Sequence, residues 1–136
     1  MCEWTYIGVP VRSHDDLLEG CTDIVYQIHF TNGTTYIGKK AVRSVRKRPP
    51  LKGYKRNRRI LVNLPFENYI GSFEGHKDIK PEQIASKTIL YQCSSRKAST
   101  YLEIETLFKT RALFKDSYIN DNISGKFFKN SLDGLL

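Results

Sequence analysis

The stretch Ile24–Gly38, IVYQIHFTNGTTYIG, decides the fold of this chain. Residues 24–30 and 35–38 are rich in β-branched and aromatic side chains, and an Asn-Gly pair lies between them at 32–33. An Asn-Gly pair between two β-prone runs is the strongest short-range signal of a β-hairpin. We therefore expect a hairpin over about residues 24–39.

The length of the hairpin loop determines whether Tyr26 and Tyr36 point to the same face of the strands. A two-residue loop would place Tyr36 opposite His29, and the two phenols would point apart. A three-residue loop ending at a left-handed Gly33 would pair Tyr36 with Ile28 and bring both phenols to one face. The sequence leaves both loops open, and the second lets the two tyrosines share one site.

A long cationic stretch follows the hairpin. Eleven of the 22 Lys and Arg residues lie between Lys39 and Arg59, and no Asp or Glu occurs between Asp23 and Glu67. The net charge of +8 favours a polyanionic partner, because opposite charge raises the rate of encounter. Nucleic acid is the first candidate for this partner, and an anionic membrane surface is the second.

The composition indicates a single folded domain. A length of 136 residues suits one hydrophobic core, and the hydrophobic fraction is 40%. Cys2, Cys21 and Cys93 show neither metal-ligand spacing nor a disulfide framework. Because there is no apolar run of transmembrane length and no signal-peptide pattern, we expect a soluble intracellular protein.

Short helices and an irregular basic segment are expected outside the hairpin. Ser13 can cap a short helix that reaches residue 19, and a second short helix is expected over 81–86. Pro49-Pro50 and Gly53 exclude one continuous helix through the basic segment, so part of that segment should be loop.

The last part of the chain predicts a strand followed by the longest helix. The strand is expected over 88–93 and the helix over about 97–113, with Ser94 or Ser95 as its cap. Four apolar residues recur near helical spacing and predict the stripe that faces the core. They are Tyr101, Ile104, Phe108 and Ala112.

Three motifs resemble those of a known family, the GIY-YIG nucleases. Ile24-Val25-Tyr26 followed by Tyr36-Ile37-Gly38 resembles the paired signature, with Ile24 where the family usually has its first Gly. Residues 67–72, ENYIGS, are similar to the Tyr-x-Gly-Ser element of phage members. Tyr101-Leu102-Glu103 is similar to the metal-binding segment.

The resemblance covers about residues 24–123, which we expect to be the nuclease core of a single domain, 1–136, with 1–23 as an N-terminal extension. It implies an α+β fold. The expected sheet is small and antiparallel, built from the hairpin and the third strand, and is flanked by the long helix and shorter ones.

The resemblance also implies a metal-dependent DNA endonuclease, which hydrolyses phosphodiester bonds. Tyr26 resembles the general base, although a phenol suits that role only where nearby cations favour the phenolate. Tyr36 resembles the tyrosine that orients water or phosphate. Arg46 matches the position of the family arginine, with Arg43 as the alternate, and a guanidinium would bind the charge that develops on the phosphate.

Glu103 resembles the metal ligand of the family, and Glu105 is its rival. Mg²⁺ (or Mn²⁺) prefers oxygen ligands and keeps several waters, so one protein carboxylate plus substrate phosphate can suffice. Glu105 is more simply read as a helix residue paired with Lys109 four positions later. Asn120 resembles the late asparagine of the family, which supports the site by hydrogen bonding.

The sequence departs from the family at one point. No histidine lies between Lys39 and Phe66, where many members carry one, and Tyr54 is the candidate replacement. The predicted nucleic-acid-binding residues are Lys39, Lys40, Arg43, Lys47, Arg48, Lys52, Tyr54, Lys55, Arg56, Arg58 and Arg59.

Two classes of function remain open on the sequence. The first is a phage-type endonuclease acting on DNA in the cytoplasm of a bacterial or phage-infected host cell, without membrane contact. The second is a non-catalytic nucleic-acid-binding protein that retains the fold, and a basic RNA-associated protein is third. Glu103 discriminates them, because a pure binder needs no carboxylate that repels phosphate. Double-strand cleavage would require a homodimer or two encounters.

Overall fold

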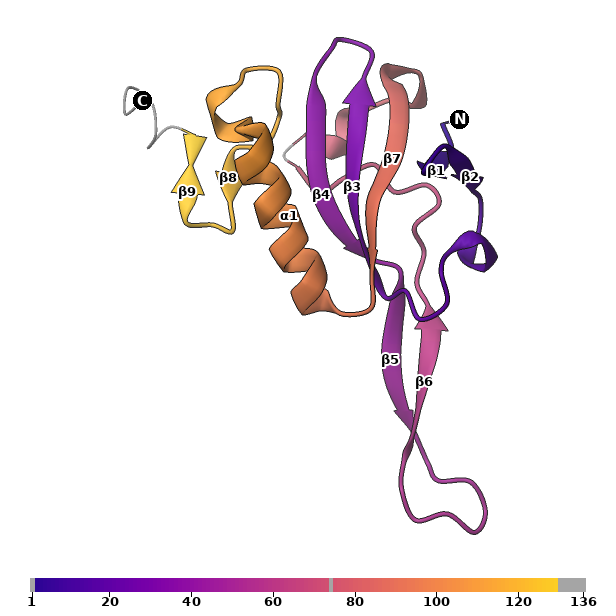
Figure 1. The fold of residues 1–136 in the computed structure, drawn as a ribbon. Helices are drawn as coiled ribbons and strands as arrows, with labels where there is room; N and C mark the ends of the chain where they lie inside the picture. Colours follow the sequence, from indigo (N-terminus) through magenta and orange to yellow (C-terminus); the bar gives the residue numbers. More distant parts are fainter. Residues whose placement is uncertain (1, 74, 130–136) are drawn as a thin grey trace.

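A computed structural model describes residues 2–73 and 75–129 and builds them around a five-stranded sheet (Figure 1). The strand order is β2-β1-β7-β3-β4. β1 runs parallel to β7, and the other neighbouring pairs are antiparallel. The bounds are β1 Trp4–Tyr6, β2 Val9–Val11, β3 Asp23–Phe30, β4 Thr35–Ala41 and β7 Ile84–Cys93.

The α+β class is confirmed, but the sheet is mixed and larger than expected. The segment expected to be an N-terminal extension contributes β1 and β2 to the sheet. β7 begins at Ile84 and not at residue 88, so the helix expected over 81–86 is reduced to the 3-10 turn Pro81–Gln83. The early residues of β7 gain backbone hydrogen bonds from β3, which a helix could not provide.

The β3–β4 hairpin has the three-residue loop. Tyr36 pairs with Ile28 and Tyr26 pairs with Gly38, which is the register that brings both phenols to one face. Gly33 is left-handed with φ 88°, as this turn requires. The hairpin prediction is therefore confirmed, together with the second of its two registers.

The basic segment forms a second hairpin that projects from the sheet (Figure 1). β5 spans Arg43–Arg48 and β6 spans Arg58–Asn63. The loop expected within this segment is confined to residues 49–57, and Pro49-Pro50 follow the end of β5 directly. We call residues 43–63 the arm.

The remaining elements are short. Ser13 caps only the 3-10 turn His14–Asp16, where its hydroxyl accepts a hydrogen bond from the Asp15 amide at 3.3 Å. The helix expected through residue 19 is therefore wrong beyond that turn. The other short elements are the 3-10 turns His76–Asp78 and Ala112–Phe114 and the strands β8 Asn122–Ile123 and β9 Phe127–Phe128.

The helix α1 spans Arg96–Thr110 and covers one face of the sheet (Figure 1). The Ser95 hydroxyl accepts from the Ala98 amide at 3.1 Å and caps it, as expected. Arg111 adopts a left-handed conformation with φ 54°, which ends the helix before residue 113.

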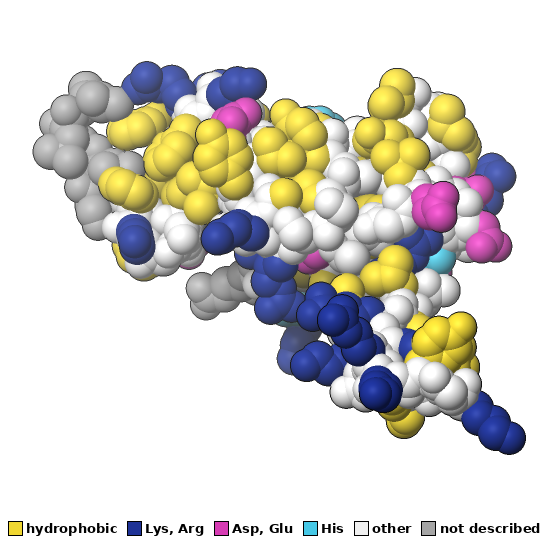
Figure 2. All heavy atoms as spheres, turned by 60° about the horizontal axis from the view of Figure 1, so that its bottom comes forward, with side chains coloured by type: hydrophobic (Ala, Val, Ile, Leu, Met, Phe, Trp, Pro, Cys, Tyr) yellow, Lys and Arg dark blue, Asp and Glu magenta, His cyan; other side chains and the backbone are white. Residues whose placement is uncertain are grey.

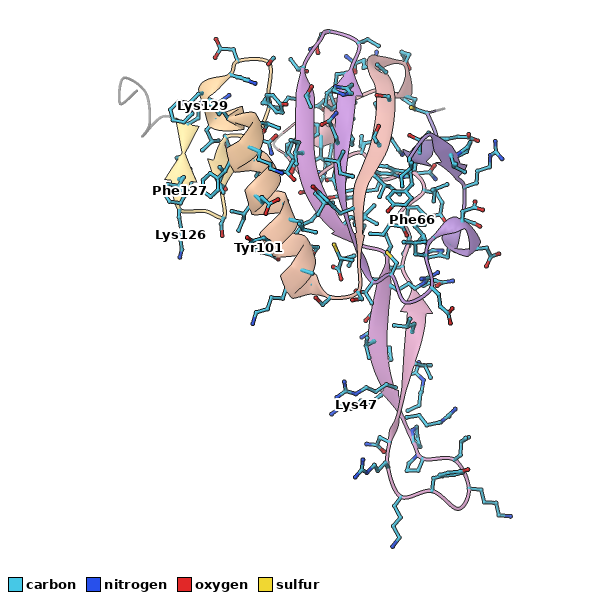
Figure 3. The ribbon with its side chains drawn as sticks, viewed as in Figure 1. Lys47, Phe66, Tyr101, Lys126, Phe127 and Lys129 are labelled. Atoms are coloured by element: carbon cyan, nitrogen blue, oxygen red, sulfur yellow. The ribbon has the colours of Figure 1, made fainter. Side chains whose placement is uncertain are left out.

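The predicted core-facing stripe is wrong for two of its four residues: Ile104 packs against the core and Ala112, just beyond α1, is buried, but the two aromatic residues are not. Tyr101 is 67% exposed and Phe108 is 52% exposed, and Tyr101 lies on the side of α1 away from the sheet (Figure 3). Ser99 and Leu107 are the buried residues of α1. Close approach to the sheet favours a small residue over a large aromatic one, so the small side chain of Ser99 faces inward.

The sheet separates two apolar layers. On the α1 side, Val25 and Ile37 pack with Leu107 and Leu113. On the other side lies the larger cluster, which contains Trp4, Ile24, Tyr26, Ile28, Phe66 and Ile89. Alternate residues of β3 therefore enter opposite layers, as the two-residue period of a strand requires.

A buried lysine links this larger layer to the segment after the arm. The Lys87 ammonium on β7 donates to the carbonyls of Glu67 at 2.9 Å and Tyr69 at 3.1 Å. It also lies 4.5 Å from the centre of the Trp4 ring. Burial lowers the pKa of Lys87 to about 8.

Candidate active site

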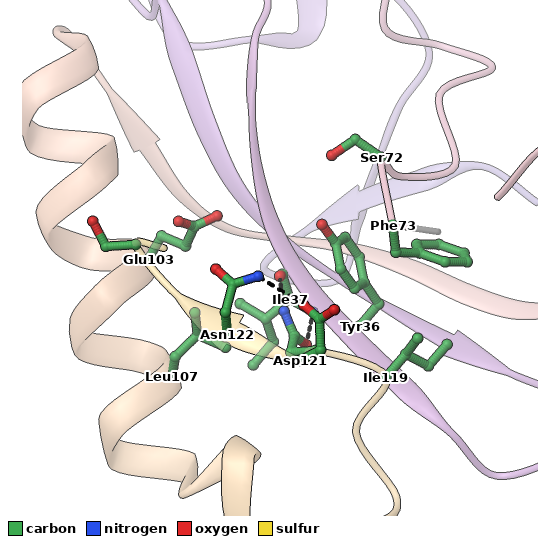
Figure 4. A pocket seen from close by; sticks show the side chains of 11 residues that line it. Tyr36, Ile37, Ser72, Phe73, Glu103, Leu107, Ile119, Asp121 and Asn122 are labelled. Atoms are coloured by element: carbon green, nitrogen blue, oxygen red, sulfur yellow. Dashed lines mark hydrogen bonds between the residues drawn. The ribbon is translucent and has the colours of Figure 1, made fainter. Parts of the chain in front are cut away.

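A cavity of about 570 Å³ opens beside the edge strand β4 (Figure 4). Its walls come from β4, α1, the segment before His76 and the segment around β8. The polar side chains that line it are Tyr36, Ser72, Glu103, Asn120, Asp121, Asn122 and Ser124. Hydroxyl, carboxylate and amide groups from four separate parts of the chain therefore meet at one opening.

The two signature tyrosines lie together at this edge, but in different environments. Tyr36 lines the cavity and is half-buried, whereas Tyr26 lies behind it with 0% exposure. Their ring centres are 6.1 Å apart, and the Tyr26 ring also packs edge-on against Tyr69 at 5.7 Å. The expected convergence on one accessible cleft therefore holds for Tyr36 and Glu103, while Tyr26 is adjacent and covered.

Gly38 creates the space for both rings. A Cβ atom at this position would lie 2.5 Å from the Tyr26 hydroxyl oxygen and 2.9 Å from an edge carbon of Tyr36. Its backbone is not left-handed, so close approach is the reason for glycine here. The last residue of the Tyr-Ile-Gly motif thus allows the Tyr26 ring to extend over β4.

The Tyr26 hydroxyl is buried and makes no hydrogen bond within residues 2–73 and 75–129. Burial raises the pKa of Tyr26, and the neighbouring Tyr36, Tyr69 and Glu103 act in the same direction. The phenolate that a general base would require is therefore disfavoured in this structure.

The environment of Tyr36 favours its neutral form too. Burial raises the pKa of Tyr36, and the adjacent Ser72 hydroxyl acts in the opposite direction. Two lysines lie on the same strand. Lys39 donates to the Thr100 hydroxyl, and Lys40 lies 5.0 Å from the centre of the Tyr69 ring.

Glu103 lies in the middle of α1 and faces the cavity (Figure 4). Burial raises the pKa of its carboxyl group, and Lys39 partly opposes that effect. In the described part of the chain, the Glu103 carboxylate has neither an ion pair nor a hydrogen bond. Glu105, by contrast, lies 3.6 Å from Lys109, which confirms the reading of Glu105 as a member of an i,i+4 pair.

The oxygen atoms around Glu103 suit a hard divalent cation. Asp121 and Asn122 line the same cavity, and the Asn122 amide donates to the Asp121 carboxylate at 2.7 Å. Among the described residues there is no cluster of three or more His, Cys, Asp or Glu side chains. The carboxylate and amide oxygens at the cavity are of the ligand type that Mg²⁺ prefers, and Mg²⁺ can be bound through one or two carboxylates and several waters.

Asn120 joins the last cavity segment to the edge strand. Its side-chain oxygen accepts from the Ile37 amide at 3.0 Å, and its side-chain nitrogen donates to the Ile37 carbonyl at 2.7 Å. Asn120 is buried, and it holds the backbone next to Tyr36 from the side where β4 has no strand neighbour. Its role in catalysis stays a prediction.

The structure does not bring the predicted arginine to this cavity. Arg46 lies on β5 and is exposed, and the pairing of β5 with β6 carries it along the arm, so it does not line the cavity. The alternate, Arg43, donates to the carbonyls of His14, Leu18 and Cys21 at 2.8 to 3.1 Å. Its guanidinium therefore anchors the arm.

Tyr54, the candidate replacement for the family histidine, is 72% exposed in the loop of the arm. It lies among arm residues and does not line the cavity. None of the three histidines lines the cavity: His14 contacts the carbonyls of Val42 and Leu64, His29 contacts Thr35, and His76 contacts the carbonyl of Phe73.

The predicted nucleic-acid-binding residues fall into two groups. Lys39 and Lys40 lie on β4, close to the tyrosines and Glu103. The others are on the arm, where Figure 2 shows Lys and Arg side chains gathered on a protruding part of the surface. Figure 3 shows Lys47 projecting from β5.

Sequence reasoning missed part of the cavity. Asp121, Asn122 and Ser124 were not singled out as site residues, because polar residues before Gly125 also indicate an ordinary turn. The polar run that directly follows Asn120 is the signal that could have identified Asp121. Ser72 belongs to the ENYIGS element but was given no separate role.

The comparison with family models agrees with this geometry. A model with the description "Putative endonuclease segE, GIY-YIG domain" matches residues 4–123. The chain belongs to the GIY-YIG nuclease family. The match to this GIY-YIG domain begins at β1, so it includes the N-terminal strands as well as the hairpin.

Membership of the GIY-YIG family implies nuclease activity on DNA, and these nucleases generally use a divalent metal. Neither the curated proteins nor the solved structures contain a significant match to the chain. Within the described residues, no helix is long and apolar enough to cross a membrane.

Proposed function

We propose that this protein is a divalent-metal-dependent DNA endonuclease that hydrolyses phosphodiester bonds in the cavity beside β4. The observation that carries the proposal is the half-buried Glu103 carboxylate, which has no protein partner among the described residues. Partial burial of a carboxylate without an ion pair or a hydrogen bond costs free energy, so a structural role does not explain it. A divalent cation would offset that cost.

Glu103 would hold the cation, and Asp121, which lines the same cavity, is the second carboxylate that could bind it directly or through water. When bound, Mg²⁺ or Mn²⁺ supplies Lewis-acid stabilisation of negative charge on the scissile phosphate. The protein's part is to provide a partly desolvated carboxylate that leaves room for a phosphate.

Both tyrosines would act in their neutral form. Their raised pKa values oppose the phenolate form, so we assign neither of them the role of general base. The Tyr36 hydroxyl, at the cavity wall, would donate to a phosphate oxygen or orient the attacking water. Tyr26 would hold the Tyr36 ring in position from behind.

The positive charge nearest the reacting phosphate would come from Lys39 and Lys40. Lys39 is close enough to Glu103 to influence its pKa, and Lys40 is next in sequence on β4. Arg46 would instead contact DNA away from the cavity, together with the other cations of the arm. Lysine binds phosphate as a point charge and does not need the fork geometry of arginine.

Plasmid nicking tests the proposal. Supercoiled plasmid incubated with the wild-type protein should be nicked in Mg²⁺ and not in a chelator. Glu103→Ala should abolish nicking, because the metal's stabilisation of the transition state is worth several kcal/mol. The same variant should bind DNA without metal at least as well as wild type, because a negative charge beside phosphate is removed.

Glu105→Ala is the matched control, because Glu105 lies two residues after Glu103 on α1 and is already paired with Lys109. It should nick at the wild-type rate. If Glu105→Ala were dead and Glu103→Ala active, the ligand assignment would be wrong, and if both cut normally the site would lie elsewhere.

A non-catalytic nucleic-acid-binding protein is the second candidate. It is favoured by the position of Arg46 outside the cavity and by the covered Tyr26. A wild-type protein that binds DNA with steep salt dependence and never nicks it, in Mg²⁺ or Mn²⁺, would establish this alternative.

A further inference from the structure

The arm carries like charges in positions that weaken its own strand pairing. In the β5–β6 ladder, Lys47 lies directly opposite Arg59 and Arg48 directly opposite Arg58. Like charges on directly opposite residues destabilise an antiparallel pair. No arm cation forms an ion pair with another described residue, and no Asp or Glu occurs in residues 43–63. Local stability therefore does not account for these side chains.

The cations occupy both faces of the ribbon. Directly paired residues share a face and successive pairs alternate, so Lys47 and Arg59 point to one face and Arg48 and Arg58 to the other. Strand residues 45–48 and 58–59 are exposed. A ribbon lying flat on a polyanion would need cations on one face only. Cations on both faces suit a site with negative charge on two sides.

The charge is concentrated toward the tip. The pair Val45–Leu61, closer to the sheet, is apolar, and the two cationic pairs are the last ones before the loop. The loop 49–57 adds Lys52, Lys55 and Arg56. The part of the arm farthest from the body is thus the part built to meet an anion.

The base of the arm is fixed to the body. The three hydrogen bonds donated by Arg43 hold the start of β5. Just beyond the end of β6, the Leu64 amide donates to the backbone carbonyl of the buried Val42 at 2.9 Å. Both strands therefore leave the sheet from anchored ends, which gives the tip a defined direction.

We propose that the arm inserts tip-first into the major groove of duplex DNA and selects the sequence that the body cuts. This inference rests on the proposed nuclease function. The major groove, about 12 Å wide and 8.5 Å deep, admits a two-stranded ribbon, whereas the minor groove, about 6 Å wide, does not. The cations on the two faces would meet the phosphates on the two walls of the groove.

The depth of the groove assigns different tasks to the loop and the strand ends. A depth of about 8.5 Å corresponds to two or three strand residues at about 3.3 Å each. The cationic pairs would therefore lie level with the phosphates, and the loop 49–57 would reach the base edges. Arg56 and the exposed Tyr54 are the loop side chains that we assign to base contact.

The chain length limits how far the selected bases lie from the cut. Ten residues separate Gly38, at the tyrosines, from Arg48, at the end of β5. An extended chain spans at most about 3.5 Å per residue, so the cavity and the end of the ribbon are no more than about 35 Å apart. The loop adds six residues as far as Tyr54, or at most about 21 Å, so the bases that the arm contacts should lie within about two helical turns of the cleaved bond.

Binding selection on randomised duplex DNA tests the proposal without requiring cleavage. Full-length wild-type protein, without metal, should enrich a short sequence containing guanine, and methylation of guanine N7 in that sequence should weaken binding roughly tenfold. Duplex RNA should compete at least tenfold less well than duplex DNA, because its major groove is too narrow to enter.

Two double variants separate the tasks. Tyr54→Ala/Arg56→Ala should lose roughly tenfold in preference for the selected sequence. The slope of log affinity against log salt concentration should change by no more than about 1, the equivalent of one phosphate contact. Lys47→Ala/Arg59→Ala should weaken binding to all sequences alike and reduce the salt slope by about 1.5 to 2. All four side chains are exposed, so the thermal melt of Tyr54→Ala/Arg56→Ala should match that of wild type, and Lys47→Ala/Arg59→Ala, which removes a like-charged pair, should melt no lower than wild type.

The outcomes distinguish the arm from the catalytic proposal. Selection without any enriched sequence, N7 methylation without effect, or equal competition by duplex RNA would overturn major-groove readout. If the protein nicks DNA but shows none of these preferences, the nuclease function is supported and the proposed role of the arm in sequence selection is refuted. Sequence-selective binding by a protein that never nicks would support the arm and refute the nuclease.

Discussion

The substitution Gly38→Ala should damage the site through steric displacement of both signature tyrosines. The added Cβ would lie 2.5 Å from the Tyr26 hydroxyl oxygen, 2.7 Å from the ring carbon that bears it and 2.9 Å from Tyr36. Distances below about 3 Å to the Cβ require something to move. The Tyr26 ring has 0% exposure and is held between Trp4 and Tyr69, so it cannot move into solvent.

Overpacking of this kind costs about 2 kcal/mol of unfolding free energy. For a domain of this size, that loss lowers Tm by roughly 8 °C. Because a displacement of about 1 Å in a catalytic group can cost a hundredfold in rate, nicking should fall by roughly that factor. Thermal melting and plasmid nicking on the same preparation give the two values.

Gly33→Ala is the matched control. Gly33 has φ 88° and open space around its Cβ position, so alanine there adds backbone strain of about 1 kcal/mol and no contact with the tyrosines. Its Tm should fall by roughly 4 °C with nicking unchanged. A Gly38→Ala protein that melts no lower than Gly33→Ala and nicks at the wild-type rate would refute the close packing inferred here.

Three further substitutions have defined outcomes. Tyr26→Phe removes a buried hydroxyl without a described partner and keeps the ring behind Tyr36, so urea denaturation should give a stability equal to wild type or up to about 1 kcal/mol higher, with nicking retained. The pKa of Glu103 is higher in the folded protein than in the unfolded chain, so the free energy of unfolding falls as pH rises from the unfolded pKa to the folded one. Glu103→Gln should therefore raise the free energy of unfolding by about 1 kcal/mol at pH 7 and leave it unchanged at pH 3. Lys87 has a folded pKa of about 8, below its unfolded value, so wild-type stability should contain a component that rises with pH between about 8 and 10.4. Lys87→Met should remove that component, by up to roughly 3 kcal/mol, in denaturation curves compared across pH.

Local signals were sufficient for several elements of the fold. The β-prone runs around Asn32-Gly33 predicted the first hairpin, and Ser95 was one of the two caps proposed for α1. The pairing of Glu105 with Lys109 followed from their spacing. In each case the interacting groups lie within a few residues of each other, so the chain alone contains the information.

Long-range packing decided what local signals could not. Tyr101 and Phe108 have the spacing of a core stripe, but the close approach of α1 to the sheet places Ser99 and Leu107 inside. The choice between two loop lengths in the first hairpin was open in the sequence, and the structure contains the longer one. Side-chain fit against distant strands determines both outcomes.

The sequence indicated which residue types make up the candidate active site, but only the tertiary structure shows which of them lie together. Tyr36 and Glu103 were identified from motifs, but Arg46 was placed only by its offset from Tyr36 along the sequence, and an offset does not say in which direction the chain runs. A strand advances about 3.3 Å per residue and a helix 1.5 Å, so pairing of β5 with β6 carries Arg46 out along the arm. The pKa of Tyr26 likewise depends on its burial by residues far away in sequence. Those residues come together only in the folded protein, so no local sequence pattern could predict this burial.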